Sequence, residues 1–404
     1  MKKQIILAFT LLLSGLLLMA AAATDPGLPD DYWQEPSATT ATAPHDWSTL
    51  EIDLHPEACA QCHAEQFNVW KSSKHAQAYS AGLVGQFPDM GHANANDCLI
   101  CHAPLKEQLY TDPKVMDASI ALRLKHAEGF DSDANMDATS TLPLRHSGVS
   151  CAVCHVRGWK RFGPPLKTTA SLGQQNTPAH GGFTATKAFE QSQFCASCHQ
   201  FPAPMAINGK PLENTLTEWK NSSFSDQGVT CQQCHMPDRK HEFRGIHDPE
   251  MVKKGLRFSL SQSKNTASLS ISSVWIGHAF PTYVTPKVIV EAEARDADQK
   301  VLQHWQWEIV REVAYNNGWQ EMRDTRLMPG ESRQFTATPL PSTTASLHYR
   351  VRVIPDHFYK NVYRSLLADP LTPAASAHLR QASQQAEQND YVLYEQVLEI
   401  RTDH

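Results

Sequence analysis

The chain of 404 residues has no cysteine outside one recurring string, C-x-x-C-H. Its ten cysteines fall in five such strings, so none is left for the structural disulfides that exported proteins normally form. The chain also lacks an excess of positive charge, because 36 Lys and Arg stand against 42 Asp and Glu, a formal net charge of −6. This acidic balance argues against nucleic acid as a partner.

Long hydrophobic runs are missing beyond the first 23 residues. This N-terminal segment has Lys2 and Lys3, then an apolar run, then small residues up to Ala23, which is the layout of a secretory signal peptide over residues 1–23. The alternative is an uncleaved membrane anchor, since the run is nearly long enough to span a bilayer. We therefore predict export to the periplasm or cell exterior of a bacterium. Association with a membrane, through a partner or an uncleaved N-terminus, stays open.

The five strings are the strongest chemical signal. They consist of Cys59, Cys62 and His63; Cys98, Cys101 and His102; Cys151, Cys154 and His155; Cys195, Cys198 and His199; and Cys231, Cys234 and His235. C-x-x-C-H is the attachment signature of c-type haem. One helical turn presents both thiols to the vinyl groups of one porphyrin, and the adjacent histidine is placed to bind the iron on the proximal side. The sequence predicts five covalently bound haem c groups.

Two other uses of paired cysteines fit poorly. Zinc ribbons use paired C-x-x-C units, but five units cannot all pair, and zinc does not account for the histidine that follows every string. A thioredoxin-like redox site needs one C-x-x-C beside a βαβ pattern. Covalent haem is therefore the preferred interpretation.

The spacing of the strings indicates close packing of redox groups. Successive strings begin between 36 and 53 residues apart, which is too little protein to build a separate core around each haem. The haems must themselves form much of the core, close to one another. Such packing permits rapid electron hopping.

A second axial ligand would decide whether each haem carries electrons or performs chemistry. Closure of the sixth position suits electron transfer, whereas an open position suits substrate binding. Residues 62–79 lack Pro and Gly and are predicted as a helix. His63 and His75 would then lie about 18 Å apart along its axis. His75, as a ligand, should therefore serve a different haem from the one that His63 holds.

Five further histidines are candidate distal ligands. His247 and His241 follow the fifth string in a segment with Pro237 and Gly245, and His180 is flanked by Pro178 and two glycines that allow close approach of backbone to a flat cofactor. The remaining two are His278 and His146, the latter just ahead of the third string. No catalytic side chain is predicted.

The strings, together with the segment WKSSKHA, resemble the multihaem c-type cytochrome superfamily that includes the tetrahaem cytochrome of nitrifiers and hydroxylamine oxidoreductase. In that family the histidine of a W-x-x-S-x-H segment ligates a neighbouring haem, which fits Trp70, Ser73 and His75. The segment GHAFPT, at 277–282, resembles one that recurs in a β-rich module. The resemblance covers about 55–290. This chain departs from the nitrifier protein in its fifth string and long C-terminal module. It also lacks the C-x-x-C-K string of the pentahaem nitrite reductases.

The chain beyond Gly255 changes its pattern from helical to alternating. Period-two alternation, as in Leu347, Tyr349, Val351 and Val353, predicts strands. The fold class expected is a mainly α multihaem domain with long loops, then a small β-sandwich and C-terminal helices. The boundaries expected are a linker at 24–50, a pentahaem domain at 51–254, a β-sandwich at 255–355 and a helical segment at 356–404. Thr372 and Pro373 are predicted to begin a helix.

The function predicted is electron transfer by an exported pentahaem cytochrome, with other redox proteins as partners. One alternative is an oxidoreductase that acts on a small nitrogen or sulfur compound at one open haem. A further alternative is a subunit of a conductive cytochrome polymer. The sequence favours an electron carrier over an enzyme.

Overall fold

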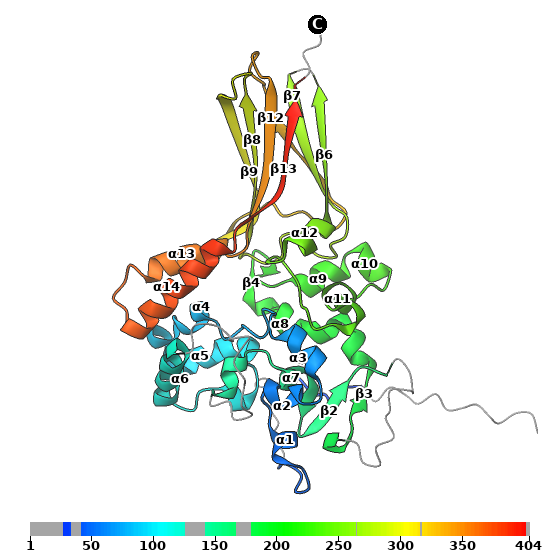
Figure 1. The fold of residues 1–404 in the computed structure, drawn as a ribbon, viewed down its shortest axis with the longest axis vertical. Helices are drawn as coiled ribbons and strands as arrows, with labels where there is room; N and C mark the ends of the chain where they lie inside the picture. Colours follow the sequence, from blue (N-terminus) through cyan, green and yellow to red (C-terminus); the bar gives the residue numbers. More distant parts are fainter. Residues whose placement is uncertain are drawn as a thin grey trace, which may run out of the picture.

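The computed structural model describes residues 27–33, 42–125, 142–166, 179–263, 265–315 and 317–400. Two regions follow each other along the long axis of the molecule (Figure 1). The helical region, residues 42–255, forms one end, and the β region, strands β6 to β13, forms the other. The predicted signal peptide, residues 1–23, lies outside the described residues. In the described part, no helix combines the length and apolar character needed to cross a membrane.

Short helices joined by long loops make up the helical region. The α-helices are α1 (Thr49–Ile52), α2 (Pro56–Ala60), α3 (Ala64–Trp70), α4 (Ala81–Val84), α5 (Phe87–His102), α6 (Pro113–Lys125), α7 (Cys151–His155), α8 (Ala196–His199), α9 (Thr215–Lys220), α10 (Ser223–Asp226), α11 (Cys231–His235) and α12 (Pro249–Gly255). Short strands accompany them, namely β1 (Val156–Arg157), β2 (Lys160–Gly163), β3 (Thr184–Ala185), β4 (Ala206–Ile207) and β5 (Lys210–Pro211).

The predicted helix over residues 62–79 is much shorter in the structure. Helix α3 ends at Trp70, and the chain then turns. Ser73 Oγ accepts a hydrogen bond from the Ala76 amide inside the turn, and Trp70 Nε1 donates to the Val149 carbonyl. Serine competes with helical hydrogen bonding through such local contacts. The turn, rather than a straight helix, therefore separates His63 from His75.

Two antiparallel sheets form the β region. The larger has the order β10-β9-β8-β12-β13, and the smaller has the order β11-β7-β6. Their strands are β6 (Leu256–Ser263), β7 (Thr266–Ser273), β8 (Lys287–Arg295), β9 (Val301–Tyr315), β10 (Trp319–Asp324), β11 (Ser332–Ala337), β12 (Ser346–Ile354) and β13 (Tyr391–Glu399). Every pairing in both sheets is antiparallel.

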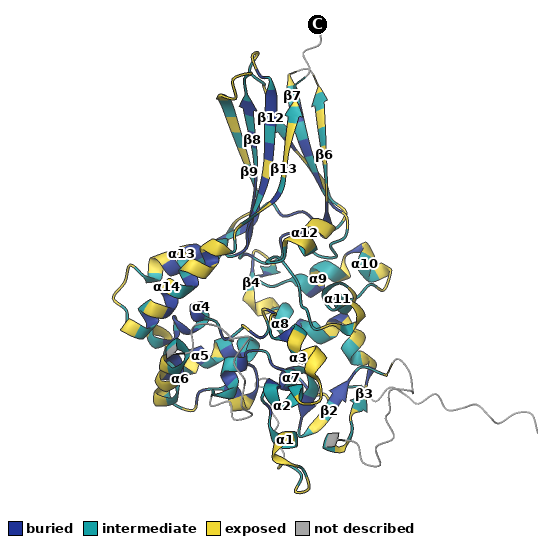
Figure 2. Ribbon diagram, viewed as in Figure 1, coloured by how far each residue is buried: buried dark blue, intermediate teal, exposed yellow. Residues whose placement is uncertain are grey.

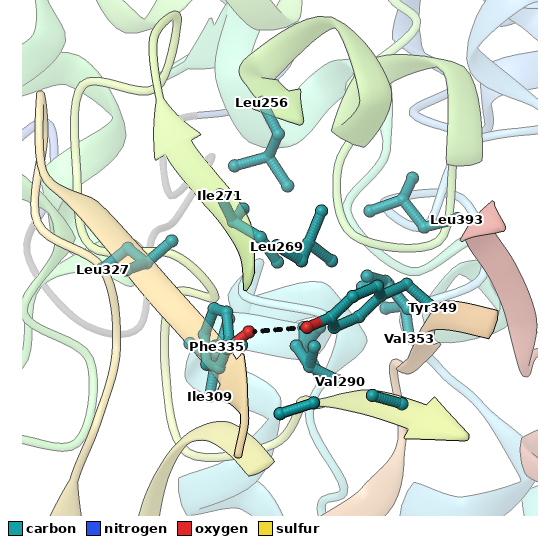
Figure 3. Packing of buried hydrophobic residues seen from close by; sticks show 14 of the residues in the cluster. Leu256, Leu269, Ile271, Val290, Ile309, Leu327, Phe335, Tyr349, Val353 and Leu393 are labelled. Atoms are coloured by element: carbon teal, nitrogen blue, oxygen red, sulfur yellow. Dashed lines mark hydrogen bonds between the residues drawn. The ribbon is translucent and has the colours of Figure 1, made fainter. Parts of the chain in front are cut away.

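Apolar side chains of both sheets meet in one core. Leu269 and Ile271 of β7 lie in the same buried cluster as Val290 of β8 and Val353 of β12 (Figure 3). The Tyr349 hydroxyl donates to the main-chain carbonyls of Ala267 and Phe335 and so joins the two sheets. Figure 2 shows buried residues gathered on β8 and β12, whereas the edge strand β13 is more exposed. The predicted alternation along residues 347–353 matches this burial.

The C-terminal segment crosses between the two regions. Helices α13 (His357–Leu366) and α14 (Pro373–Gln388) leave the sheet and pack beside α4 and α6 of the helical region (Figure 1). Thr372 Oγ1 caps α14 by accepting from the Ala375 amide, and Pro373 is the first helical residue, as predicted. The expectation that 356–404 is only helical needs correction, because β13 returns and pairs with the free edge of β12.

Buried ion pairs join the two regions. Arg326 is paired with Glu218 of α9 and with Asp324 of β10. Arg311 of β9, which is fully buried, pairs with Glu321 and donates to the main-chain carbonyls of Pro211 and Lys210. Because buried charges are tolerated only when they are paired and hydrogen-bonded, these contacts fix the junction. The chain thus has a helical region, a β-rich region and C-terminal helices, as the sequence predicted in outline.

Candidate haem-binding sites

The five C-x-x-C-H strings lie on or beside short helices. Helices α7 and α11 coincide with the third and fifth strings, and α5 ends with the second. The first string begins in the last turn of α2, and the fourth begins at the end of a 3-10 helix and continues into α8. Residues three apart share one helical face, so each string can present two thiols to one porphyrin edge. None of the ten cysteines forms a disulfide with another.

Three pairs of histidines have the separation that one iron requires. Metal–imidazole bonds of about 2.0–2.1 Å put two rings on opposite sides of one iron with their centres about 6 Å apart. The ring centres of His75 and His199 are 6.2 Å apart, those of His155 and His241 are 6.2 Å apart, and those of His235 and His278 are 6.3 Å apart. Each pair joins a proximal histidine to a predicted distal one. These residues therefore fit haem iron with two axial histidines.

Hydrogen bonds orient these histidines. The Nδ1 atoms of His102, His155 and His235 donate to the main-chain carbonyls of Ala78, Phe162 and Arg244, at 3.0, 2.7 and 2.6 Å. Among the distal candidates, His278 and His180 donate in the same way to Ala279 and Gly182, both at 3.0 Å. A histidine that donates from one ring nitrogen presents the other to a metal. Nε2 is thereby left to the iron.

The protonation states also suit ligation. Burial is the largest cause of the lowered pKa values of these histidines, and neighbouring histidines lower them further. The pKa of His75 falls to about 3, and those of His199, His241 and His278 fall to about 4. The rings are therefore neutral at physiological pH, which is the form that binds metal.

The segment between Trp70 and His75 is fixed by a second loop. The Val149 amide donates to the His75 carbonyl, and Trp70 Nε1 donates to the Val149 carbonyl. Gly148 adopts a positive φ of 57°, and a Cβ there would lie 2.5 Å from the His75 carbonyl oxygen. Only glycine fits this close approach. The W-x-x-S-x-H pattern thus makes a turn that directs His75 away from the first string and toward His199 of the fourth.

His180 lies near the first string. Burial lowers the pKa of His63, and the nearby His180 lowers it further. The His180 amide donates to Glu51 of α1, and its own φ of 44° is a conformation that few residues adopt. The structure thus places His180 within electrostatic reach of His63.

Two predicted distal ligands, His247 and His146, contact other side chains in the structure. Nε2 of His247 contacts both carboxylate oxygens of Asp356 at 3.0 and 3.2 Å, so it is not available to iron. Nε2 of His146 lies 2.9 Å from Ser119 Oγ, and its ring stacks on Tyr79. Both residues were selected from their sequence position near a string.

The second string differs from the others in its surroundings. Within the described ranges, His102 is not among the three paired rings, and neither is His63 of the first string. His102 lies near His199, since the two rings interact electrostatically. Beside it, Tyr79 contacts the hydroxyls of Tyr110 and Ser119 at 2.5 and 3.1 Å. A network of hydroxyl groups therefore borders this string.

Contacts between strings give their order in space. Cys59 and Cys151 are hydrogen-bond partners, as are Cys195 and Cys231. Cys154 lies within electrostatic reach of Cys195 and Cys198. The first string therefore adjoins the third, the third adjoins the fourth, and the fourth adjoins both the fifth and the second.

No sequence pattern selected Tyr283, which the structure places against a proximal histidine. Its hydroxyl lies 2.5 Å from His199 Nδ1. Glu213 Oε2 is 4.0 Å from the same nitrogen, and burial raises the pKa of Glu213 to about 8. The only available signal was position, since Tyr283 directly follows the GHAFPT segment that carries His278.

Comparison with known proteins agrees with these sites. Residues 58–120 match the family model described as cytochrome c554 and c-prime. No curated protein matches the chain. A penta-haem cytochrome c552 from Thermochromatium tepidum is similar in structure, with a TM-score of 0.56 and 19% identity, covering 87% of this chain and 100% of that one. A β-glucuronidase of Bacteroides uniformis, 16% identical, covers 25% of this chain and 11% of its own, with a TM-score of only 0.13.

The predicted resemblance to multihaem cytochromes is confirmed by the family match and by the shared fold. Covalent haem c follows from the family, and c-type cytochromes are typically extracytoplasmic. Over residues 58–120 the chain is thus similar to the cytochrome c554 and c-prime family, and its fold is similar to that of a penta-haem cytochrome.

Proposed function

We propose that this chain is an exported cytochrome with five haem c groups that carries electrons between redox partners. The observation that carries the proposal is the set of three histidine pairs with ring centres 6.2 or 6.3 Å apart. Two axial histidines close both faces of an iron, and a closed iron favours electron transfer over substrate binding. His180 is proposed as the fourth distal ligand, opposite His63.

Haem, when bound, supplies one-electron redox chemistry, and the protein determines where each group lies and what can reach it. The ten cysteines hold the porphyrins, and the five proximal histidines bind the irons. His75 is proposed to hold a haem of the fourth string although it belongs to the segment after the first. One segment thereby connects two haem sites and fixes their separation.

The order of the strings supports a branched route. The first, third and fourth strings adjoin in that order, and the second and fifth both adjoin the fourth. Electrons are proposed to pass along this order. The fourth string lies at the branch point. The reduction potential of its haem therefore governs electron transfer along both branches.

The surroundings of His102 favour a second candidate function. Nε2 of His146, a predicted distal ligand, contacts the hydroxyl of Ser119. The haem of the second string would then keep an open position, where a small nitrogen or sulfur compound could bind and exchange electrons. This candidate makes the protein an oxidoreductase that uses the other haems as its electron supply.

Partners are proposed to be other redox proteins. Without Lys2 and Lys3 the formal net charge is −8, which favours electrostatic steering toward a basic partner. Electron exchange with such a partner should then slow as the salt concentration rises. A rate that does not change with salt would remove charge as the docking force.

Two measurements test the proposed function. Mass spectrometry of the mature protein should give five haem additions and no titratable thiol, and four additions would refute the count. Electron paramagnetic resonance of the oxidised protein should show mainly low-spin haem. A single high-spin haem that changes its signal with nitrite, hydroxylamine or sulfite would favour the oxidoreductase, whereas entirely low-spin haem would favour the carrier.

A further inference from the structure

His199, the proximal histidine of the fourth string, differs from three other proximal histidines in the hydrogen-bond partner of its Nδ1 atom. His102, His155 and His235 each donate from Nδ1 to a main-chain carbonyl, which no side-chain substitution can remove. Nδ1 of His199 instead lies 2.5 Å from the hydroxyl of Tyr283. Glu213, at 4.0 Å, is beyond hydrogen-bond distance of the same nitrogen. A side chain of the loop before β8 thus takes the place of backbone.

Tyr283 is firmly held in this position. Its ring is nearly parallel to that of His199, with an interplanar angle of 11° and ring centres 6.2 Å apart. Its φ is 66°, a left-handed conformation that is rare for a large side chain and persists only where the surroundings impose it. Thr215 of α9 hydrogen-bonds with Tyr283 and, through Oγ1, with Thr282 at 2.9 Å. The hydroxyl is therefore fixed from both sides.

The loop that carries Tyr283 is anchored to the helical region as well. The Ala279 amide donates to Glu218 of α9, and Phe280 exchanges main-chain hydrogen bonds with Leu327. The same loop carries His278, which faces His235 of the fifth string. The β region thereby reaches two neighbouring haem sites through one short segment.

We propose that Tyr283 is a positioning residue that sets the reduction potential of the haem of the fourth string by accepting the Nδ1 proton of His199. This inference rests on the proposed function, in which His199 and His75 hold that haem. An acceptor at Nδ1 increases the basicity of the ligating nitrogen, and a more basic ligand stabilises the oxidised iron. Tyr283 therefore holds this potential low. Because the fourth string adjoins three others, its potential affects the whole route.

The test uses the complete holoprotein carrying Tyr283→Phe, which keeps the ring and removes the hydroxyl. The haem of the fourth string should become easier to reduce by on the order of tenfold, which is about 59 mV for one electron. The remaining haems should keep their potentials because their Nδ1 partners are unchanged. His75→Met, made alone and with Tyr283→Phe, marks the haem in question by a sulfur–iron charge-transfer band.

Tyr349→Phe is the matched control, because it removes a buried tyrosine hydroxyl within the β core, bonded only to carbonyls. It should leave all potentials unchanged. A shift of equal size in Tyr349→Phe, or no shift of the marked haem in Tyr283→Phe, would overturn the inference. If Tyr283→Phe fails to acquire five haems, Thr215→Val removes a partner of the phenol instead. It should move the marked haem in the same direction by less, and no movement would equally reject the role of Tyr283.

The two proposals fail separately. If His75→Met changes no haem spectrum, His75 is not a ligand, and the assignment in the proposed function is wrong. If His75→Met marks one haem but neither Tyr283→Phe nor Thr215→Val moves its potential, the ligand assignment stands and only the inference on Tyr283 is lost.

Discussion

The helical region and the β region bury their apolar residues in different ways. In the described residues, one cluster of nineteen buried side chains fills the β region, whereas the clusters around α5 and α7 hold nine and five. All ten cysteines lie in the helical region, and most of them are only partly buried. The β region has an ordinary protein core. The helical region has little apolar core of its own, so covalent haem must contribute much of what holds it together.

The junction between the regions is stabilised by ion pairs and by apolar packing. Ion pairs of Arg311 and Arg326 tie the larger sheet to the helical region. Helices α13 and α14 extend from the β region and bury Leu379 and Tyr363 against Ala81 of α4. The β region therefore offers a rigid support, from which the loop with His278 and Tyr283 enters the haem sites.

The largest expected effect comes from preventing haem attachment. Chain produced without haem maturation should retain a folded β region and lose the helical region, because only the former has a complete apolar core. Limited proteolysis should leave a resistant fragment that begins near residue 255. The holoprotein, digested in parallel, should stay largely intact. Resistance of residues 51–254 in the haem-free chain would contradict the comparison between the two regions.

A cavity in the β core should give the next largest effect. Leu269 is fully buried between the sheets, and Leu269→Ala should lower the free energy of unfolding of the β region by about 2–5 kcal/mol. The haem absorption spectrum under native conditions should stay as in the wild type. The exposed Val301→Ala is the matched control and should change stability little. A loss of haem in Leu269→Ala would mean that the regions do not fold separately.

Acid should weaken the junction through Asp324. Burial by itself would raise the pKa of Asp324, but hydrogen bonds from Arg326 and Lys210 outweigh it and hold the pKa below 3.8. A folded pKa below the unfolded value means that the pair stabilises the fold above about pH 4 and that this contribution is lost as the pH falls further. Denaturant unfolding at about pH 3 and pH 7 should show a smaller loss with acid in Asp324→Asn than in the wild type. Equal losses would exclude this pair as a cause of acid sensitivity.

Substitution of a distal histidine should have the smallest effect on the fold. Its effect on the spectrum of one haem should nevertheless be clear. His75→Ala should keep five attached haems, since thioether bonds do not use His75, and should convert one haem from low-spin to high-spin. His247→Ala is the matched control, because its Nε2 contacts Asp356 and its ring is not one of the three pairs. It should change no spin state. Electron paramagnetic resonance of the two variants compares them directly, and unchanged spin in His75→Ala would remove it from the ligand set.

Local chemistry explains what could be predicted. The C-x-x-C-H spacing is a contact within one helical turn, so the strings predict haem-attachment residues without knowledge of the fold. Alternation along residues 347–353 and the capping pair Thr372 and Pro373 are equally local, and the structure agrees with both. Strand β13 was missed because its position depends on pairing with β12, after two intervening helices.

The sequence by itself determined the change from helix to strand near Gly255 and predicted the cofactor class and its attachment residues, because each depends on residues that are neighbours in the chain. Only the tertiary structure decided which histidine rings lie at the separation that one iron requires. His75 and His199 are 124 positions apart, and the sequence offered His247 and His146 as readily. It also decided the order of the strings and the contact of Tyr283 with His199. The physical reason is that a second axial ligand and its hydrogen-bond partner need only be close in space, so no spacing along the chain encodes them.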